Sequence, residues 1–396
     1  MHFTAPVSST VNRLFKVVLL GLLTVLLVHQ IVALTDNPKL PVNDFVEYWA
    51  ASRLLLEKQN PYAPDLVFLA ERAVGWPADF PQMMWNPPWT LSYVLPFGAV
   101  DFKLGQVMWL TMNLFCIFLS AHFLWYCYEG SLKKVWIAWI LAISFAPSLI
   151  SLKVGQICPL MLLGVAGFLV CLRHQRDFVA GTLTVLVSFK PHLLYLFWIV
   201  LLLWILHEKR WKVLSGVITS FSVSLLIPLV YNPQLLQQYL FSAIHNPPTQ
   251  WVTVTMGALT RRLWDSSSTW LQFLPSFLGG GCILWYWTRA RLHWDWIDEL
   301  PGLILLSVLT ASYGWESDQV VFLPAIIESA ARLGQAKWDM RKTMAVSVYL
   351  VANALILILN LFKAGPLSYI WIAPILLASY WLIRRMTVVK RQEKTI

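Results

Sequence analysis

Residues 104–126 read LGQVMWLTMNLFCIFLSAHFLWY, and this stretch decides the class of fold. It contains no Asp, Glu, Lys or Arg. A helix of this length extends about 34 Å at about 1.5 Å per residue, enough to cross the roughly 30 Å hydrocarbon core of a bilayer. The stretch therefore predicts a membrane-spanning helix.

Apolar runs of this kind recur along the whole chain. The 396 residues are 58% hydrophobic and 13% charged, with a mean hydropathy of +0.62, whereas soluble domains carry about 25% charged residues. Many of the 22 Trp and 13 Tyr lie near the ends of the runs, at the interfacial positions that amphipathic rings prefer. These features exclude a soluble domain and predict an all-α polytopic membrane protein. Besides 104–126, the runs are 17–34, 135–150, 157–172, 178–189, 191–206, 213–230, 267–288, 300–312, 320–331, 344–361 and 367–383.

The net charge of +10 does not indicate nucleic acid, because the basic residues gather in short connectors between apolar runs. With the N-terminus in the cytoplasm, about 20 Lys and Arg fall on the cytoplasmic side and about 10 outside. This assignment gives a single domain, 1–396, with about twelve membrane helices and a cytoplasmic C-terminus. It requires that 178–189 and 191–206 form a hairpin bent at Lys190-Pro191, and that Trp89 to Val100 lie at the interface without spanning.

Val17 to Leu34 is interpreted as an uncleaved first helix, the alternative being a cleaved signal peptide. The two long loops, about 35–103 and about 231–262, then fall on the extracytoplasmic side, and the first is expected to carry short interfacial helices. None of the five cysteines forms a C-x-x-C pair, so neither a zinc site nor a disulfide framework is indicated.

Asp44, Glu47 and Tyr48 are the first candidate site, about ten residues beyond the first helix. Their spacing places them on one helical face. A carboxylate near the membrane surface among aromatic residues suits a general base acting on a hydroxyl. The alternative is a solvated, amphipathic surface helix.

A second candidate site joins Gln156 to Lys190 through a helical hairpin. A lysine within an apolar run is costly unless its side chain reaches the interface or meets an anion. Next to Pro191, the Lys190 ammonium could point at a phosphate in a cavity. The alternative is that the lysine reaches the interface.

Three other polar motifs remain. Tyr313-Gly-Trp-Glu-Ser-Asp318-Gln319 lies between two apolar runs and is either functional or a plain polar turn. Arg261-Arg262 is a basic pair on the outer side, where basic residues are disfavoured, which favours anion binding over a solvated pair. Trp85-Asn86-Pro87-Pro88-Trp89 is interpreted as a structural turn. The chain has no Walker A motif, no dinucleotide-binding glycine motif, no H-E-x-x-H, no nucleophile elbow and no evident repeat between its halves.

The order of these pieces resembles glycosyltransferase family 87, over about residues 40 to 330. The matching residues are Asp44 to Trp49, Asn60-Pro61-Tyr62, Asn86-Pro87-Pro88, Gly155-Gln156, Ala180-Gly181 with Lys190-Pro191, and Tyr313 to Gln319. The chain departs from the family at Cys158, since many members have Gly-Gln-x-Asn where this one has Gly-Gln-Ile-Cys.

The resemblance implies a GT-C-type scaffold in the cell membrane, with its active site on the extracytoplasmic side. It also implies an inverting transfer of a sugar, mannose being the candidate, from a polyprenyl phosphate to a hydroxyl on a lipid or glycan. Asp44 occupies the position of the family's catalytic acid and is the expected general base, with Glu47 and Tyr48 beside it. The phosphate is expected on Lys190, Arg261 and Arg262, and the sugar on Gln156, Asp318 and Gln319. No cofactor is expected and, because the first loop lacks Asp-x-Asp, no metal; Glu316 and Asp318 stay an alternative metal pair. The alternative function is a transporter or flippase of lipid-linked saccharides, which has no need of Asp44.

Overall fold

The computed structural model describes residues 41–247, 251–335 and 340–392, and this part of the chain is helical throughout, without strands. The predicted helix over 17–34 lies outside these residues. Four segments are long and apolar enough to span a membrane: Phe102–Cys127, Trp211–Tyr231, Lys342–Leu361 and Pro366–Arg385. A fifth span is possible if the bent pair Leu132–Ser144 and Ala146–Val154 counts as one. The all-α membrane class is therefore confirmed.

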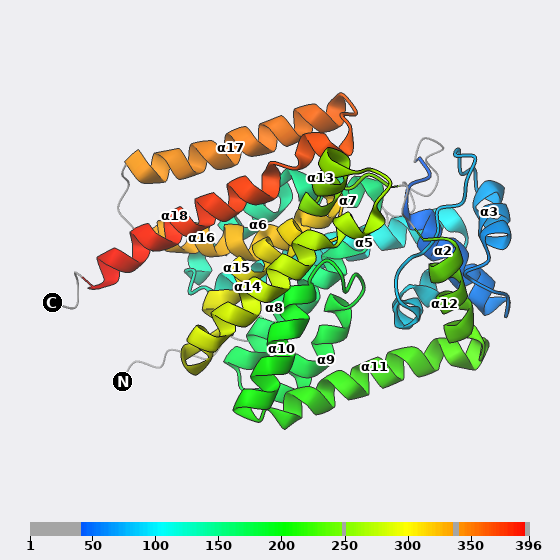
Figure 1. Cartoon of the computed structure of the whole chain (residues 1–396), viewed down its shortest axis with the longest axis horizontal. Coiled ribbons are helices and arrows are strands. Elements are labelled where there is room, and N and C mark those ends of the chain that lie inside the picture. The colour runs from blue at the N-terminus through cyan, green and yellow to red at the C-terminus, as the bar shows by residue number, and fades with distance from the viewer. Residues whose placement is uncertain (1–40, 248–250, 336–339, 393–396) are drawn as a thin grey trace, which may run out of the picture.

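The helices follow the predicted apolar runs closely, but several are too short to span alone. Three of the shorter apolar helices are α8 (Cys158–Arg173), α9 (Asp177–Val187) and α10 (Tyr195–Glu208). They pack beside the long α5 (Phe102–Cys127) and α11 (Trp211–Tyr231), as Figure 1 shows. The later helices are α14 (Leu274–Ala290), α15 (Trp296–Thr310), α16 (Leu323–Gln335), α17 (Met340–Leu361) and α18 (Ile372–Gln392).

Glycine allows a close crossing in this bundle, between α9 and α11. A Cβ on Gly181 would overlap the carbonyl oxygen of Val213, and one on Gly216 would overlap that of Phe178. The two backbones can approach this closely only because neither glycine carries a side chain, as is common where membrane helices pack. This contact fixes α9, whose C-terminal end leads to Lys190.

The run 135–150 forms a broken helix. It divides into α6 (Val135–Ser144) and α7 (Ala146–Val154). The segments Leu132–Ser144 and Ala146–Val154 are bent by 58° relative to each other. The Ala146 backbone N–H exposed by the break donates to Asn353 Oδ1 of α17 at 2.6 Å. Such a bond is needed, because an unpaired backbone group in an apolar surrounding costs several kcal/mol (about 2–7). The break directs the C-terminal end of α7, and with it Gln156, toward the first loop.

The first predicted loop folds into α2 (Phe45–Leu56), α3 (Pro64–Ala73) and α4 (Leu91–Gly98). As predicted, the stretch from Trp89 to Val100 forms no long helix. The alternative of a solvated surface helix for α2 is wrong: ten of its twelve residues are buried, including Glu47 and Tyr48. The reason is that α2 packs against α3, α4 and α5. In Figure 1, α11 leads away from the bundle to α12 (Leu235–His245), which lies beside this region.

Candidate active site

Gln156 is the centre of the candidate site. Its Nε2 donates to Asp44 Oδ2 at 2.7 Å, while its Oε1 accepts from Lys190 Nζ at 2.8 Å and from Tyr48 Oη at 3.3 Å. Since an ammonium and a phenol hydroxyl both donate to the same amide oxygen, the amide nitrogen must face Asp44. Two candidate sites that the sequence predicts separately, Asp44 with Tyr48 and Gln156 with Lys190, thus form one hydrogen-bonded cluster.

Asp318 completes this cluster on the side of Lys190. Lys190 Nζ lies 2.7 Å from Asp318 Oδ1, and the two residues are 8% and 0% exposed. Asp318 Oδ2 accepts from the Trp315 backbone N–H at 3.0 Å, and its Oδ1 also accepts from Cys158 Sγ at 3.1 Å. The alternatives are wrong here: Lys190 does not reach the interface, and Asp318 is not in a solvated turn.

Backbone turns set these side chains in place. Gly155 ends α7 with φ +84°, a left-handed conformation that glycine adopts readily, and Gln156 follows it. The Gly155 carbonyl accepts from Trp109 Nε1 of α5 at 2.8 Å, and the Val154 carbonyl accepts from the Asp44 N–H at 2.9 Å. The end of α7 and the start of α2 are therefore joined directly.

The motif from Trp85 to Trp89 anchors the segment that carries Lys190. Asn86 Nδ2 donates to the Phe189 carbonyl at 2.8 Å, and Trp89 Nε1 donates to Ser188 Oγ at 2.8 Å. Helix α9 ends at Val187 and α10 begins at Tyr195, so the predicted bend at Lys190-Pro191 is present. The turn has a structural role, as interpreted, and that role is to hold Lys190.

Several carboxylates surround the cluster, and burial acts on each of them. Burial raises the pKa of Asp44, although the Gln156 hydrogen bond and the Lys190 charge oppose it. Burial and the charge of Asp44 raise the pKa of Glu47 well above its ordinary value. Burial would also raise the pKa of Asp318, but Lys190 outweighs it and the pKa lies below the ordinary value. Asp318 is thus the fixed anion, whereas Asp44 can take up a proton more readily.

Glu71, on α3, belongs to this region although the sequence motifs did not include it. It is fully buried; its Oε2 accepts from the Gln82 N–H at 2.9 Å, and its Oε1 has no hydrogen-bond partner. Burial raises its pKa to about 8, with a further contribution from Asp44. Cys158 and Trp315 were likewise not proposed as site residues. An acidic residue in the short helix 64–73 is the only sequence signal for Glu71, and it is a weak one.

The remaining predicted residues lie outside the hydrogen-bonded cluster. Arg261 and Arg262 lie on α13 (Met256–Trp264), where Arg261 Nη1 donates to Gln272 Oε1 at 3.2 Å and Arg262 is exposed. Gln319 is buried next to Asp318, and its Oε1 has no hydrogen-bond partner. Within the described ranges, no group of three or more His, Cys, Asp or Glu is placed to hold a metal ion.

The arrangement offers a half-buried carboxylate held by an amide, beside a fixed ion pair. The sequence profile of glycosyltransferase family 87 matches residues 84–315, more than half of the chain. The match includes Gln156, Lys190 and the two arginines, whereas Asp44 and Asp318 lie outside it. No curated protein and no solved structure matches the chain. With the profile match in agreement with the motifs and the apolar helices, the chain belongs to glycosyltransferase family 87.

Proposed function

We propose that the protein moves one sugar from a polyprenyl-phosphate carrier to an acceptor hydroxyl, with inversion, at the extracytoplasmic face of the cell membrane. Family membership supports a glycosyl transfer, and the apolar helices support a donor that resides in the membrane. Mannose is the sugar we propose, and a GT-C scaffold of about twelve spans is the matching architecture.

The environment of Asp44 is the observation that carries this proposal. Its Oδ2 is held by Gln156 at 2.7 Å, and among the described residues no hydrogen bond reaches its Oδ1. The residue is partly exposed and its Oδ1 is not one of the fully buried unpaired oxygens, which supports the approach of an acceptor hydroxyl to that atom. A carboxylate that is oriented on one side, accessible on the other and raised in pKa is suited to act as a general base.

The proposed reaction is one displacement. As the acceptor oxygen forms its bond to the anomeric carbon, its proton passes to Asp44. The bond between the anomeric carbon and the phosphate oxygen breaks on the opposite side, and its electron pair leaves with the polyprenyl phosphate. A single displacement from the face opposite the leaving group inverts the configuration.

Lys190 and the arginines have different parts in this proposal. Lys190 is already bound by Asp318 and Gln156, so its main task is to fix the amide that orients Asp44. Arg261 and Arg262 lie on a helix whose Leu263 and Trp264 are strongly exposed apolar side chains. A basic pair next to exposed apolar groups suits a phosphate on a lipid tail.

The test is transfer by the purified full chain in lipid nanodiscs, given polyprenyl-phosphate-[14C]mannose and a membrane lipid and glycan extract. We expect a labelled product that requires Asp44, with the Asp44→Asn variant as control. If the parent, reconstituted in sealed proteoliposomes, moves the intact labelled donor across the bilayer and forms no product, the protein is a flippase and the proposal is wrong.

A further inference from the structure

Three aromatic residues beside the candidate site form a surface to which neither the sequence motifs nor the proposed mechanism gives a role. Phe80, Trp251 and Trp315, here called the aromatic platform, come from three separate segments. The ring centroids of Phe80 and Trp251 are 6.0 Å apart with an interplanar angle of 76°, and those of Trp251 and Trp315 are 6.4 Å apart at 79°, so neighbouring rings meet edge to face. Phe80 is 50% exposed and both tryptophans are partly exposed, so all three rings remain accessible.

The platform begins at the candidate site and leads outward. The Lys190 ammonium lies 5.4 Å from the centre of the Trp315 ring, a cation–π contact. The Trp315 backbone N–H donates to Asp318. Trp251 contacts Trp315 and Phe80 contacts Trp251, so each ring in this order is one contact further from Lys190. A molecule that covers these rings therefore has one end beside the cluster around Gln156.

The backbone of the segments that carry the three rings is held in place by hydrogen bonds. The Val254 N–H donates to the Gly314 carbonyl at 2.8 Å, which joins the segment of Trp251 to that of Trp315. In the loop that carries Phe80, Trp76 Nε1 donates to the Phe80 carbonyl at 3.0 Å. Glu71 and Arg72 bind the same loop through the Gln82 N–H and the Trp76 carbonyl. Exposed aromatic rings that are fixed in advance lose little entropy when a ligand covers them.

The charges around the platform decide which ligand it suits. Glu316, which is partly exposed, follows Trp315 directly, whereas Lys190, which lies over that ring, is paired with the fully buried Asp318. An anionic group is repelled by Glu316, and an acyl chain gains nothing from this carboxylate. A neutral sugar fits both features: its C–H face packs on aromatic rings, and its hydroxyls can donate to Glu316.

We propose that the aromatic platform binds a sugar ring of the acceptor, so that the acceptor is a glycan whose reacting hydroxyl is directed toward Asp44. This inference rests on the proposed function, because it names the acceptor of that reaction. It assigns Phe80, Trp251 and Trp315 to substrate binding and not to the chemical step.

The test measures saccharide binding without transfer, by saturation-transfer-difference NMR on the full chain in lipid nanodiscs, since maltoside detergents would themselves occupy a sugar site. The probes are mannobiose, maltotriose and N,N′-diacetylchitobiose, with dodecanol as the non-sugar alcohol. We expect saturable binding of at least one saccharide, weakened about three- to tenfold by Trp251→Ala and less by Trp251→Phe. Trp211→Ala, at a 53% exposed tryptophan at the start of α11 and outside the platform, is the matched control and should bind as the parent does.

Four outcomes would overturn the inference: no saccharide binds; Trp251→Ala binds as tightly as the parent; dodecanol displaces the saccharide; or an excess of polyprenyl-phosphate-mannose displaces it, which would assign the platform to the donor sugar. The failure of the proposed function looks different, because saccharide binding would persist without any transfer. Transfer to a non-sugar acceptor without saccharide binding would overturn the inference alone.

Discussion

Lys190 Nζ lies 2.7 Å from Asp318 Oδ1 although 128 residues separate them in the chain. Both side chains are buried, and the same ammonium also donates to Gln156. A charge that is taken out of water is costly, and it is tolerated here because each partner neutralises the other. The pair thus holds the segment that follows α9 against the 3-10 helix η5 (Glu316–Phe322), which contains Asp318.

Breaking this pair should destabilise the protein more than removing it. We expect Lys190→Met and Asp318→Asn each to cost about 3–5 kcal/mol of stability, because each leaves one buried group without its partner. The double variant Lys190→Met with Asp318→Leu should recover most of this loss yet remain inactive, since Gln156 is no longer fixed. Thermal unfolding in nanodiscs measures the first effect and sugar transfer the second. A fully active double variant would show that the pair is only structural.

Glu71 should make stability depend on pH. Its pKa is raised to about 8 from an ordinary value of 4.5, mainly by burial. The folded protein therefore holds this proton more tightly than the unfolded chain. Its contribution to stability is complete below pH 4.5 and is lost as the pH rises to about 8. We expect Glu71→Gln to flatten the decline in melting temperature over this range, whereas Asp65→Asn, at an exposed position of the same helix, should leave it unchanged.

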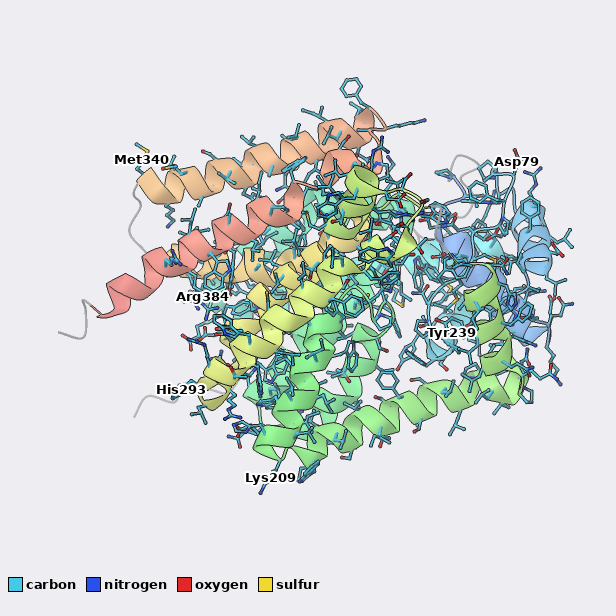
Figure 2. All side chains as sticks on the ribbon, viewed as in Figure 1. Asp79, Lys209, Tyr239, His293, Met340 and Arg384 are labelled. Carbon is cyan, nitrogen blue, oxygen red and sulfur yellow. The ribbon has the colours of Figure 1, made fainter. Side chains whose placement is uncertain are left out.

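The sidedness of the chain can be tested at Asp65 and Lys209. Our topology places Asp65 outside and the connector of Lys209, between α10 and α11, in the cytoplasm. Figure 2 shows Lys209 at one edge of the molecule and Asp79, which belongs to the same loop as Asp65, at another. In a variant without native cysteines, a membrane-impermeant maleimide should label a cysteine at Asp65 in intact cells and spare one at Lys209. The reverse labelling would contradict the assignment.

The arginines of α13 should affect the donor and not the acceptor. Replacing Arg261 and Arg262 together by Gln removes charge-assisted bonds to the phosphate, each of about 1.5–3 kcal/mol. We expect a higher KM for the donor and an unchanged KM for the acceptor. Arg289→Gln, on α14 in contact with Trp285, is a control for the loss of a surface charge. An unchanged donor KM in the double variant would remove the phosphate from both arginines and leave Arg261 with its structural contact to Gln272.

The sequence predicted helices well and contacts poorly, for a physical reason. A helix is predicted from the hydropathy of residues that are neighbours in the chain. The predicted run 104–126 therefore matches α5 (Phe102–Cys127), with both ends within two residues. The bend at Lys190-Pro191 was predictable too, because proline disrupts a helix locally. The bonds of Gln156 to Asp44 and Lys190 span 112 and 34 residues, and no local pattern encodes them. The break at Ala146 was missed although Pro147 gives a local signal for it; only its hydrogen-bond partner Asn353, which is 207 residues away, has no such signal.

For the acidic residues, too, the sequence predicted local positions but not tertiary surroundings. The spacing of Asp44, Glu47 and Tyr48 correctly placed Asp44 and Tyr48 toward one partner, Gln156. It could not show that α2 is buried, because that depends on α3, α4 and α5 packing around it. Glu71 gave no usable signal, since its importance lies entirely in its tertiary surroundings.

Asp44→Asn is the variant on which the functional proposal depends most. Asn keeps the size of the side chain and can still accept the hydrogen bond from Gln156 through its Oδ1, but it cannot take a proton from the acceptor. Loss of a general base typically lowers the rate by about 10²–10⁴-fold. We therefore expect turnover at or below about 1% of the parent, with donor binding unchanged because the proposed phosphate contacts are made by other residues. Glu47→Gln should retain more activity, since Glu47 is buried behind the site beside Tyr48 and has only a supporting role. Turnover by the parent should also depend on pH. Because burial raises the pKa of Asp44, this residue takes up its proton at a higher pH than an ordinary aspartate does. On acidification, activity should therefore be lost at a correspondingly higher pH. Near-parental turnover by Asp44→Asn would remove the base from the mechanism and favour a flippase, in which this carboxylate has no chemical task.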